Sequence, residues 1–480
     1  MLEITSLKSF FDEIEETNGD DECRAWLSRV FDAKVELAAF VAARRRRRRA
    51  GTATEYVGFL KGSFNFSLRF KFSDGGPDAI IRFPKPGHTA TALRDEKVAN
   101  EIEAMEFLRQ NTTMPIPHVH CWGLTKDSPH RFGPFIIMDY VEGEKLSTLL
   151  KKPMESDDED LVLNPSIEDA TLATIYRQIA SYLLQLSRLS FNRIGAISKD
   201  GSKWSVTKRP LTYNMNELAT VAGYPQNRFP TSTFDRASDY FASLSREHLA
   251  HLWTQRNIAD DAEIARARFV ARRRFAQLIP YYCISDSGPF LPFCDDLRPS
   301  NMLVDPKTLK ITAVLDLEFT NAMPAQFTYD PPWWLLLSGP EAWLDRDSMD
   351  EFRKCYEPRM EQFLHALEEE EQEEEEGERK VLSASDQESA LLPPPRRLSS
   401  LMRESWRCGR FWFDYAARKS FELDTIYWTA LHGSSSSGDG IEVPEDGIEA
   451  ELGPFIEAKM EQLRLYEEEC AARFSQTSSG

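Results

Sequence analysis

A short polar stretch of the sequence combines residue types that could carry out chemistry. It holds two adjacent carboxylates, Asp295 and Asp296, and then Asn301, five positions after Asp296. Asp316 ends the next apolar run, ITAVLD, fifteen positions after Asn301. A carboxylate such as Asp296 can accept the proton of a hydroxyl group, while an amide and a carboxylate, Asn301 and Asp316, offer oxygen ligands that Mg²⁺ accepts. Transfer of a phosphoryl group from ATP requires this set, a positioned hydroxyl and a metal that bridges the phosphates.

Each of these residues also has an ordinary structural interpretation. Aspartates often form part of turns, so Asp296 could cap one, and Asn301 and Asp316 could end a loop and a strand. Their joint spacing favours the catalytic interpretation, because the segments NMLV and ITAVL predict a hairpin that brings Asn301 and Asp316 together. Asp295 is interpreted as a solvated neighbour of Asp296.

The elements that must position these residues begin with a strand-rich region. From 56 to 87 apolar and polar residues alternate around the turn SDGGPD, which predicts two hairpin strands and a third strand. A helix is predicted over 92–110, with Glu101 beside its apolar stripe. The apolar segment PFIIMDYVEG, 134–143, predicts a further strand.

Before this region, residues 1 to about 43 show apolar residues at helical spacing. The run Arg44–Arg49 follows. It is interpreted as a basic helix end, where cations suit the helix dipole, and the alternative is a nuclear-import or polyanion-binding patch.

From about 146 onward the pattern is mainly helical. Amphipathic patterns predict helices over 170–189 and 260–283, and 211–230 between them is interpreted as an aromatic-rich loop. The segment 368–399 is rich in glutamate and low in complexity, and it is predicted to be a disordered insertion.

Composition excludes several classes of protein. The 480 residues carry a formal net charge of −19, which argues against nucleic acid as the main partner. The seven cysteines form no CxxC pair, which suggests free thiols in a reducing compartment. No apolar run approaches the length of a membrane span, and the acidic N-terminus lacks an apolar signal core. We therefore expect a cytoplasmic protein without a membrane partner, with nuclear localisation through Arg44–Arg49 as the alternative.

The order of these features resembles a known family. D-x-x-x-x-N followed by a strand-end aspartate, here CDDLRPSN and ITAVLDLEF, is similar to the catalytic region of the aminoglycoside phosphotransferase family, and DLRPSNMLVD and DPPWWLLL resemble its fungal type. The resemblance covers about 56–345 and implies an α+β, protein-kinase-like fold with a small antiparallel-sheet N-lobe and a larger, mainly helical C-lobe. The expected parts are a helical extension with the arginine run (1–55), the N-lobe and hinge (56–145), the C-lobe with the catalytic loop (146–367), the acidic insertion (368–399) and a C-terminal helical part of the C-lobe (400–480).

The resemblance also implies roles for individual residues. Asp296 matches the catalytic base, and Asn301 and Asp316 match the ligands of Mg²⁺. Further residues are expected to form the nucleotide site: Gly62 and Ser63 in a phosphate-covering hairpin, Arg82 in place of the family's phosphate-binding lysine, Glu101 as the ion-pair partner of Arg82, and the backbone from Met138 to Tyr140 at the adenine.

The implied function is transfer of the γ-phosphate of ATP to a hydroxyl group of a small molecule, with an acceptor pocket built by about 150–285. Cys294 stands where the family has a histidine, and Arg82 where it has a lysine. The alternative is therefore a catalytically impaired pseudokinase or nucleotide-binding scaffold. Trp333 and Trp334 are expected in the core rather than as a substrate platform.

Overall fold

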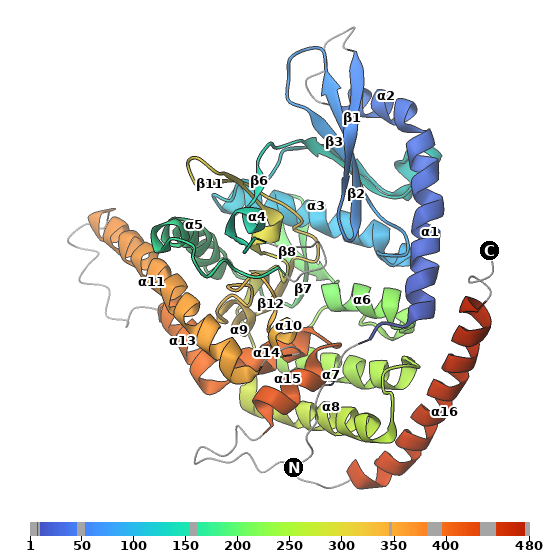
Figure 1. Ribbon diagram of the computed structural model, residues 1–480. Helices are drawn as coiled ribbons and strands as arrows, with labels where there is room; N and C mark the ends of the chain where they lie inside the picture. Colours follow the sequence, from blue (N-terminus) through green and yellow to red (C-terminus); the bar gives the residue numbers. More distant parts are fainter. Residues whose placement is uncertain are drawn as a thin grey trace.

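A computed structural model describes residues 7, 10–45, 53–153, 161–344, 348–381, 396–432 and 448–475. A small N-terminal lobe built on an antiparallel sheet packs onto a larger, mainly helical lobe (Figure 1). The two-lobed α+β fold expected from the sequence is thereby confirmed.

The sheet of the N-lobe has five antiparallel strands in the order β1-β2-β3-β5-β4. The first three are the strands predicted over 56–87, and the predicted strand at 134–143 is β5. The strands are β1 (Thr54–Lys61), β2 (Asn65–Phe72), β3 (Ala79–Pro84), β4 (Val119–Gly123) and β5 (Phe135–Asp139).

Helices cover both faces of this sheet because successive side chains of a strand point to opposite faces. Ile80 packs into the main hydrophobic cluster with Val98 and Ile102 of α3 (Arg94–Asn111). Its neighbour Ile81 packs on the other face in a cluster that contains Trp26. Helices α1 (Glu13–Asp32) and α2 (Lys34–Arg44) form that second layer.

The helical prediction for the N-terminal region is confirmed for 13–44, with a break at Ala33 between the two helices. Arg44 ends α2, and Arg45 forms a buried ion pair with Asp74, 3.0 Å between Nη1 and Oδ2. The remaining residues of the arginine run, 46–49, lie outside the described residues.

The C-lobe combines two small sheets with a set of helices. Strands β11, β10 and β6 form one sheet, and β8, β7, β12 and β9 form the other. The strands are β6 (Glu144–Lys145), β7 (Gly195–Asp200), β8 (Lys203–Lys208), β9 (Phe290–Phe293), β10 (Met302–Asp305), β11 (Lys310–Val314) and β12 (Asn321–Pro324). The helices are α4 (Leu146–Leu150), α5 (Asp169–Ser187), α6 (Tyr213–Val221), α7 (Ala237–Thr254), α8 (Ala262–Tyr282), α9 (Ala325–Thr328), α10 (Pro340–Leu344), α11 (Met349–Val381), α13 (Leu398–Cys408), α14 (Arg410–Arg418), α15 (Leu423–Ile426) and α16 (Ile448–Phe474). Within the described residues, none of these helices combines the length and the apolar character that crossing a membrane would require.

The loop interpretation of 211–230 is wrong for its first half, which contains α6. Thr212 caps this helix by accepting a hydrogen bond from the Met215 N–H, and Met215 and Leu218 are buried beside Phe421. A helix of nine residues is too short to be stable by its own propensity. Tertiary packing therefore decides its conformation.

The prediction of disorder is also wrong for the glutamate run up to residue 377. These residues continue α11, which lies beside α5 and α13 (Figure 1). Arginines of the neighbouring helices accompany the run: Arg177 pairs with Glu370 and Glu373, and Arg403 pairs with Glu368. Facing cations reduce the repulsion among the glutamates and allow the helix to continue. Residues 382–395 lie outside the described residues.

Candidate active site

The catalytic loop lies between β9 and β10, and Asp296 is its central residue. The Asn301 side-chain amide donates to Asp296 Oδ2 at 2.7 Å and to the Asp296 carbonyl at 3.0 Å. Arg298 Nε lies 2.6 Å from Asp296 Oδ1. Burial raises the pKa of Asp296 to about 6, although the cation of Arg298 and the hydrogen bond from Asn301 oppose the shift. Asp296 is thus a held carboxylate that is more basic than an exposed aspartate.

The predicted hairpin is present and brings Asn301 close to Asp316. Strands β10 and β11 pair with Met302 opposite Val314, and the Leu315 N–H donates to the Asn301 carbonyl at 2.8 Å. Asp316 follows with a φ of +52°, in the left-handed region that aspartate adopts more readily than most residues. The chain turns sharply here, and the Asp316 carboxylate accepts a hydrogen bond from Arg82.

The donor set formed by Asn301 and Asp316 suits Mg²⁺. The Asn301 amide nitrogen is turned to Asp296, which leaves the amide oxygen on the opposite side, and the Asp316 side chain is 35% exposed. Among the described side chains, no three of His, Cys, Asp or Glu are grouped as a metal site. A single carboxylate with an amide oxygen is what Mg²⁺ commonly uses, since phosphate and water complete its shell.

Arg82 and Glu101 form the ion pair that was predicted between β3 and α3. The two side chains are 6% and 1% exposed. The second guanidinium nitrogen of Arg82 reaches Asp316. Burial disfavours the charge on Arg82, but the carboxylates of Glu101 and Asp316 outweigh it and raise its pKa. The predicted contact is therefore present, and the role of Arg82 at a phosphate stays a prediction.

Gly62 and Ser63 lie in the turn between β1 and β2. The Gly62 N–H donates to the Asn65 carbonyl at 2.9 Å, which closes the turn. At its tip the Phe64 ring meets the Tyr213 ring edge-on, 5.4 Å between centroids. The turn thus reaches across to the C-lobe, as a loop that covers phosphates would.

The hinge residues Met138 and Tyr140 lie at the end of β5. Met138 is paired within the sheet to Ile80 and Val119, and the Tyr140 N–H donates to the Asp78 carbonyl at 2.9 Å. The Arg69 guanidinium lies 3.7 Å from the centre of the Tyr140 ring. The adenine contact assigned to this segment stays a prediction, and the Tyr140 N–H would have to leave Asp78 to take part in it.

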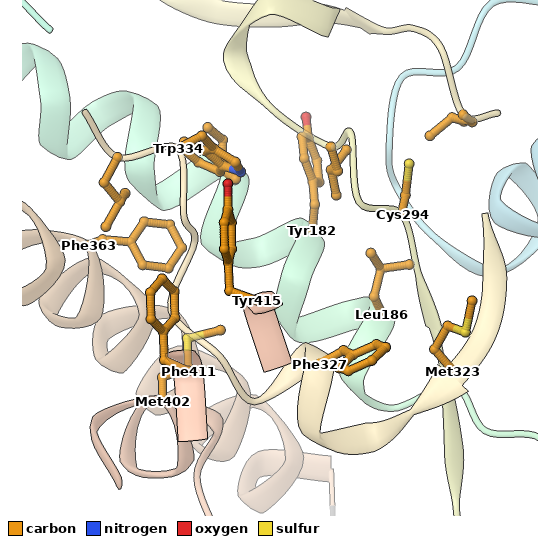
Figure 2. Packing of buried hydrophobic residues seen from close by; sticks show 14 of the residues in the cluster. Tyr182, Leu186, Cys294, Met323, Phe327, Trp334, Phe363, Met402, Phe411 and Tyr415 are labelled. Carbon is orange, nitrogen blue, oxygen red and sulfur yellow. The ribbon is translucent and has the colours of Figure 1, made fainter. Parts of the chain in front are cut away.

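Cys294, at the position of the family's histidine, links two loops of the site. It belongs to the main hydrophobic cluster, part of which is drawn in Figure 2. Its Sγ donates to the Glu318 carbonyl at 3.9 Å, so the thiol joins the catalytic loop to the segment that follows Asp316. Burial raises the pKa of Cys294 to about 12, which keeps it a neutral donor.

The interpretation of Asp295 as a solvated neighbour is wrong. Its carboxylate forms a buried ion pair with Arg418, and Lys419 Nζ lies 3.7 Å away. Burial alone would raise the pKa of Asp295, but these cations lower it. No local pattern could identify this role, because Arg418 is 123 positions away in sequence.

Four residues near Asp296 were not assigned to the site from the sequence: Tyr213 and Glu217 on α6, Trp333 and Lys419. The Trp333 indole donates to the Asp295 carbonyl at 3.2 Å, and Lys419 Nζ lies 4.4 Å from the centre of the Tyr213 ring and 5.8 Å from that of Trp333. Burial raises the pKa of Glu217 to about 7. Trp334 is 4% exposed in the core, as predicted, whereas Trp333 is half-buried beside the catalytic loop.

This chain is similar to known proteins in sequence and in fold. A family model described as the phosphotransferase enzyme family matches residues 59–356. Clavilactone A biosynthesis cluster protein Y of Ampulloclitocybe clavipes is 25% identical over 289 residues, which cover 58% of this chain and 63% of that protein. Altered inheritance of mitochondria protein 9, mitochondrial, of Scheffersomyces stipitis is 25% identical over 124 residues, 25% of this chain and 18% of that protein. The matches thus span less than two thirds of either relative.

Among solved structures, the ethanolamine kinase of Plasmodium vivax aligns with a TM-score of 0.38 at 11% identity, over 86% of this chain and 82% of that chain.

Proposed function

Because this chain belongs to the phosphotransferase enzyme family, we propose that it transfers the γ-phosphoryl group of ATP to a hydroxyl group of a small molecule. The observation that carries the proposal is the arrangement of Asp296, Asn301 and Asp316. Asn301 holds Asp296 at 2.7 Å through its amide nitrogen and is joined through its carbonyl to the residue before Asp316. A proton acceptor beside two oxygen ligands is what phosphoryl transfer needs.

In the proposed reaction Asp296 orients the acceptor hydroxyl and takes its proton. The hydroxyl oxygen forms a bond to the γ-phosphorus, and the bond from that phosphorus to the bridging oxygen of ADP breaks, so that ADP leaves with the electron pair. Burial raises the pKa of Asp296 to about 6, so its carboxylate is ionised at neutral pH and is more basic than an exposed one. The hydrogen bond from Asn301 fixes the carboxylate in the orientation that receives the proton.

Asn301 and Asp316 are the residues that would hold Mg²⁺. When bound, this ion neutralises negative charge that develops on the phosphates. Arg82 contributes a positive charge beside Asp316, and Glu101 keeps its guanidinium in place. An arginine can grip two oxygens of a phosphate at once.

The acceptor is proposed to bind against Tyr213, Glu217, Trp333 and Lys419. These side chains supply two aromatic surfaces, one carboxyl group and one ammonium group near Asp296. The set suits a small polar molecule that carries a hydroxyl group. All four come from segments outside the catalytic motif, which is consistent with an acceptor pocket that varies while the transfer site stays the same.

The first test compares the wild type with Asp296→Asn. Binding of MgADP, followed by isothermal titration calorimetry, is expected to be similar in both proteins, because Asp296 is assigned to the hydroxyl and not to the nucleotide. Phosphate transfer in a screen of hydroxylated metabolites is expected to fall by about 10²-fold or more in the variant. Undiminished transfer in Asp296→Asn would show that the assigned base is wrong.

The second candidate function is nucleotide binding without turnover. The observation that favours it is the thiol of Cys294 where the resemblance implies a histidine, since its hydrogen bond to the Glu318 carbonyl, 3.9 Å long, is a weak link between the two loops. Binding of MgADP by the wild type without transfer to any metabolite, and without ATP hydrolysis, is the outcome expected for this candidate.

A further inference from the structure

Three polar side chains from three separate elements meet between the two lobes: Asn65 at the start of β2, Lys97 on α3 and Glu318 after β11. The Asn65 amide nitrogen donates to Glu318 Oε2 at 2.8 Å, and Lys97 Nζ donates to Asn65 Oδ1 at 3.2 Å. Lys97 also forms an ion pair with Glu318, in which the two side chains are 1% and 4% exposed. The three groups therefore form a closed cluster in which Lys97 and Glu318 are buried and Asn65 is half-buried.

This cluster adjoins three parts of the proposed nucleotide site. Asn65 follows the turn that contains Gly62 and Ser63, and Glu318 is two residues after Asp316. Lys97 lies one helical turn before Glu101. Asn65 and Glu318 thus join the phosphate-covering turn to the metal-side loop, and Lys97 of α3 contacts both residues.

The charges around Lys97 explain why a cation is needed at this position. Two buried carboxylates, Glu101 and Glu318, and the partly exposed carboxylate of Asp316 face two cations, Arg82 and Lys97. Without Lys97, Arg82 would be the one cation among the remaining four groups, and Glu318 would be a buried carboxylate without an ion-pair partner in the set. An uncompensated carboxylate beside Asp316 would repel the phosphates of a nucleotide.

Arg82 cannot easily take over this work. Its two terminal nitrogens already contact Glu101 and Asp316, and charge-assisted contacts of this kind hold a planar guanidinium in one orientation. The ammonium group of Lys97 has three donors and a flexible stem. It can hold Asn65 and Glu318 together at the same time, as observed.

We propose that Lys97 is a positioning residue of the nucleotide site, which ties the Gly62–Phe64 turn to the loop of Asp316 through Asn65 and Glu318. The resemblance implies a single strand lysine at the phosphates. In this chain Arg82 contacts Glu101 and Asp316, and Lys97 fixes the position of the turn through Asn65. This inference rests on the proposed function, because it requires that a nucleotide binds at the proposed site.

The test measures MgADP affinity by titration calorimetry and stability by urea denaturation in the full chain. Lys97→Met is expected to weaken MgADP binding at least tenfold, whereas Lys97→Arg retains a cation and is expected to stay within about threefold of the wild type. The double variant K97M/E318Q removes both charges, so no buried carboxylate is left alone. It is expected to recover most of the lost stability while MgADP binding stays at least fivefold weaker.

Lys199→Met serves as the matched control. Lys199 forms an ion pair with Glu106, which lies on the same helix as Lys97. This pair is more exposed, with side chains 31% and 46% exposed. The MgADP affinity of Lys199→Met is expected to equal that of the wild type.

The outcomes separate this inference from the proposed function. A wild type that does not bind MgADP would overturn both. A wild type that binds MgADP together with a Lys97→Met variant of equal affinity would overturn the positioning role alone. Full recovery of affinity in K97M/E318Q would also overturn it, since Lys97 would then act only by neutralising Glu318.

Discussion

Replacing Asp295 by asparagine removes the carboxylate that faces two cations of the C-lobe. Asp295 and Arg418 are 14% and 7% exposed, and Lys419 lies 3.7 Å from the same carboxylate. In Asp295→Asn the guanidinium of Arg418 remains buried without its charged partner. We expect a folded protein of lower stability, because the desolvation of Arg418 is then no longer compensated.

The size of the loss in stability depends on the contacts that Arg418 retains in the variant. Breaking a buried ion pair by removing one partner typically costs about 3 to 5 kcal/mol. Arg418 Nε retains the Asp414 carbonyl at 3.1 Å, and its guanidinium lies 4.9 Å from the Phe293 ring and 5.2 Å from the Phe327 ring. Because these contacts offset part of the loss, we place the decrease in the free energy of unfolding near the lower limit, about 3 kcal/mol.

The difference in stability between the wild type and Asp295→Asn depends on pH in a definite direction. Burial alone would raise the pKa of Asp295, but Arg418 and Lys419 lower it below its ordinary value of 3.8. The stabilisation is therefore present above about pH 4 and is lost as the pH falls through the lower value of the folded state. Wild type and Asp295→Asn should differ at pH 7 and converge in strong acid.

The assay is urea denaturation at pH 7, followed by tryptophan fluorescence and by circular dichroism. A lower midpoint with an unchanged slope would report lost stability, and agreement of the two probes would justify a two-state treatment.

Asp296→Asn is the matched control, since it makes the same change one residue later. Burial disfavours the charge of Asp296, whose pKa is raised to about 6, so its removal should leave stability equal or higher. An Asp295→Asn variant within about 0.5 kcal/mol of the wild type, or an Asp296→Asn variant that loses more stability than Asp295→Asn, would refute the reasoning.

Two further predictions concern the C-lobe. Burial, together with the charge of Arg272, lowers the pKa of His248 to about 3, so the unfolded chain binds a proton that the folded chain does not, and stability should fall by up to about 1.4 kcal/mol per pH unit as the pH drops below 6.5. Denaturation midpoints measured from pH 7.5 to 4.5 should show a shallower slope in His248→Gln, and parallel slopes would contradict the assignment. The buried carboxylate of Glu371 accepts the N–H and hydroxyl of Ser399 at 3.0 and 2.6 Å near the start of α13, so Glu371→Ala should lower stability by about 1 to 2 kcal/mol. Glu373→Ala, in the same run but 67% exposed, should have a much smaller effect, and equal losses in the two variants would exclude the capping role.

Much of the site could be predicted because its signals are local. Alternation of apolar and polar residues predicts strands within a few positions, and the hairpin of β10 and β11 needs only a short connection between two apolar runs. For the same reason the spacing of Asn301 and Asp316 indicated their proximity. The contact of Arg82 with Glu101 followed from the order of a strand and a helix in the resemblance.

The remaining features depend on distant parts of the chain. The segment of α6 is short and rich in turn-forming residues, and its helix is stabilised by packing against residues such as Phe421. The glutamates of α11 would repel one another in isolation, but arginines of α5 and α13 lie beside them. In the sequence, Lys97 has no feature that distinguishes it from other lysines on a helix. Its role depends on contacts with Asn65 and Glu318, which only the fold brings close to it.

The sequence by itself determined the first three strands of the N-lobe and β5, the position of the catalytic loop and the identity of its acids, because these depend on residue type and on spacing over a few positions. Only the tertiary structure decided what each acid does. Asp296 meets Asn301 five positions away and keeps a basic carboxylate, whereas Asp295 meets Arg418 from a distant helix and becomes part of the core. The physical reason is that burial changes the free energy of a charge, and which charges share a buried site is decided by the packing of the whole chain.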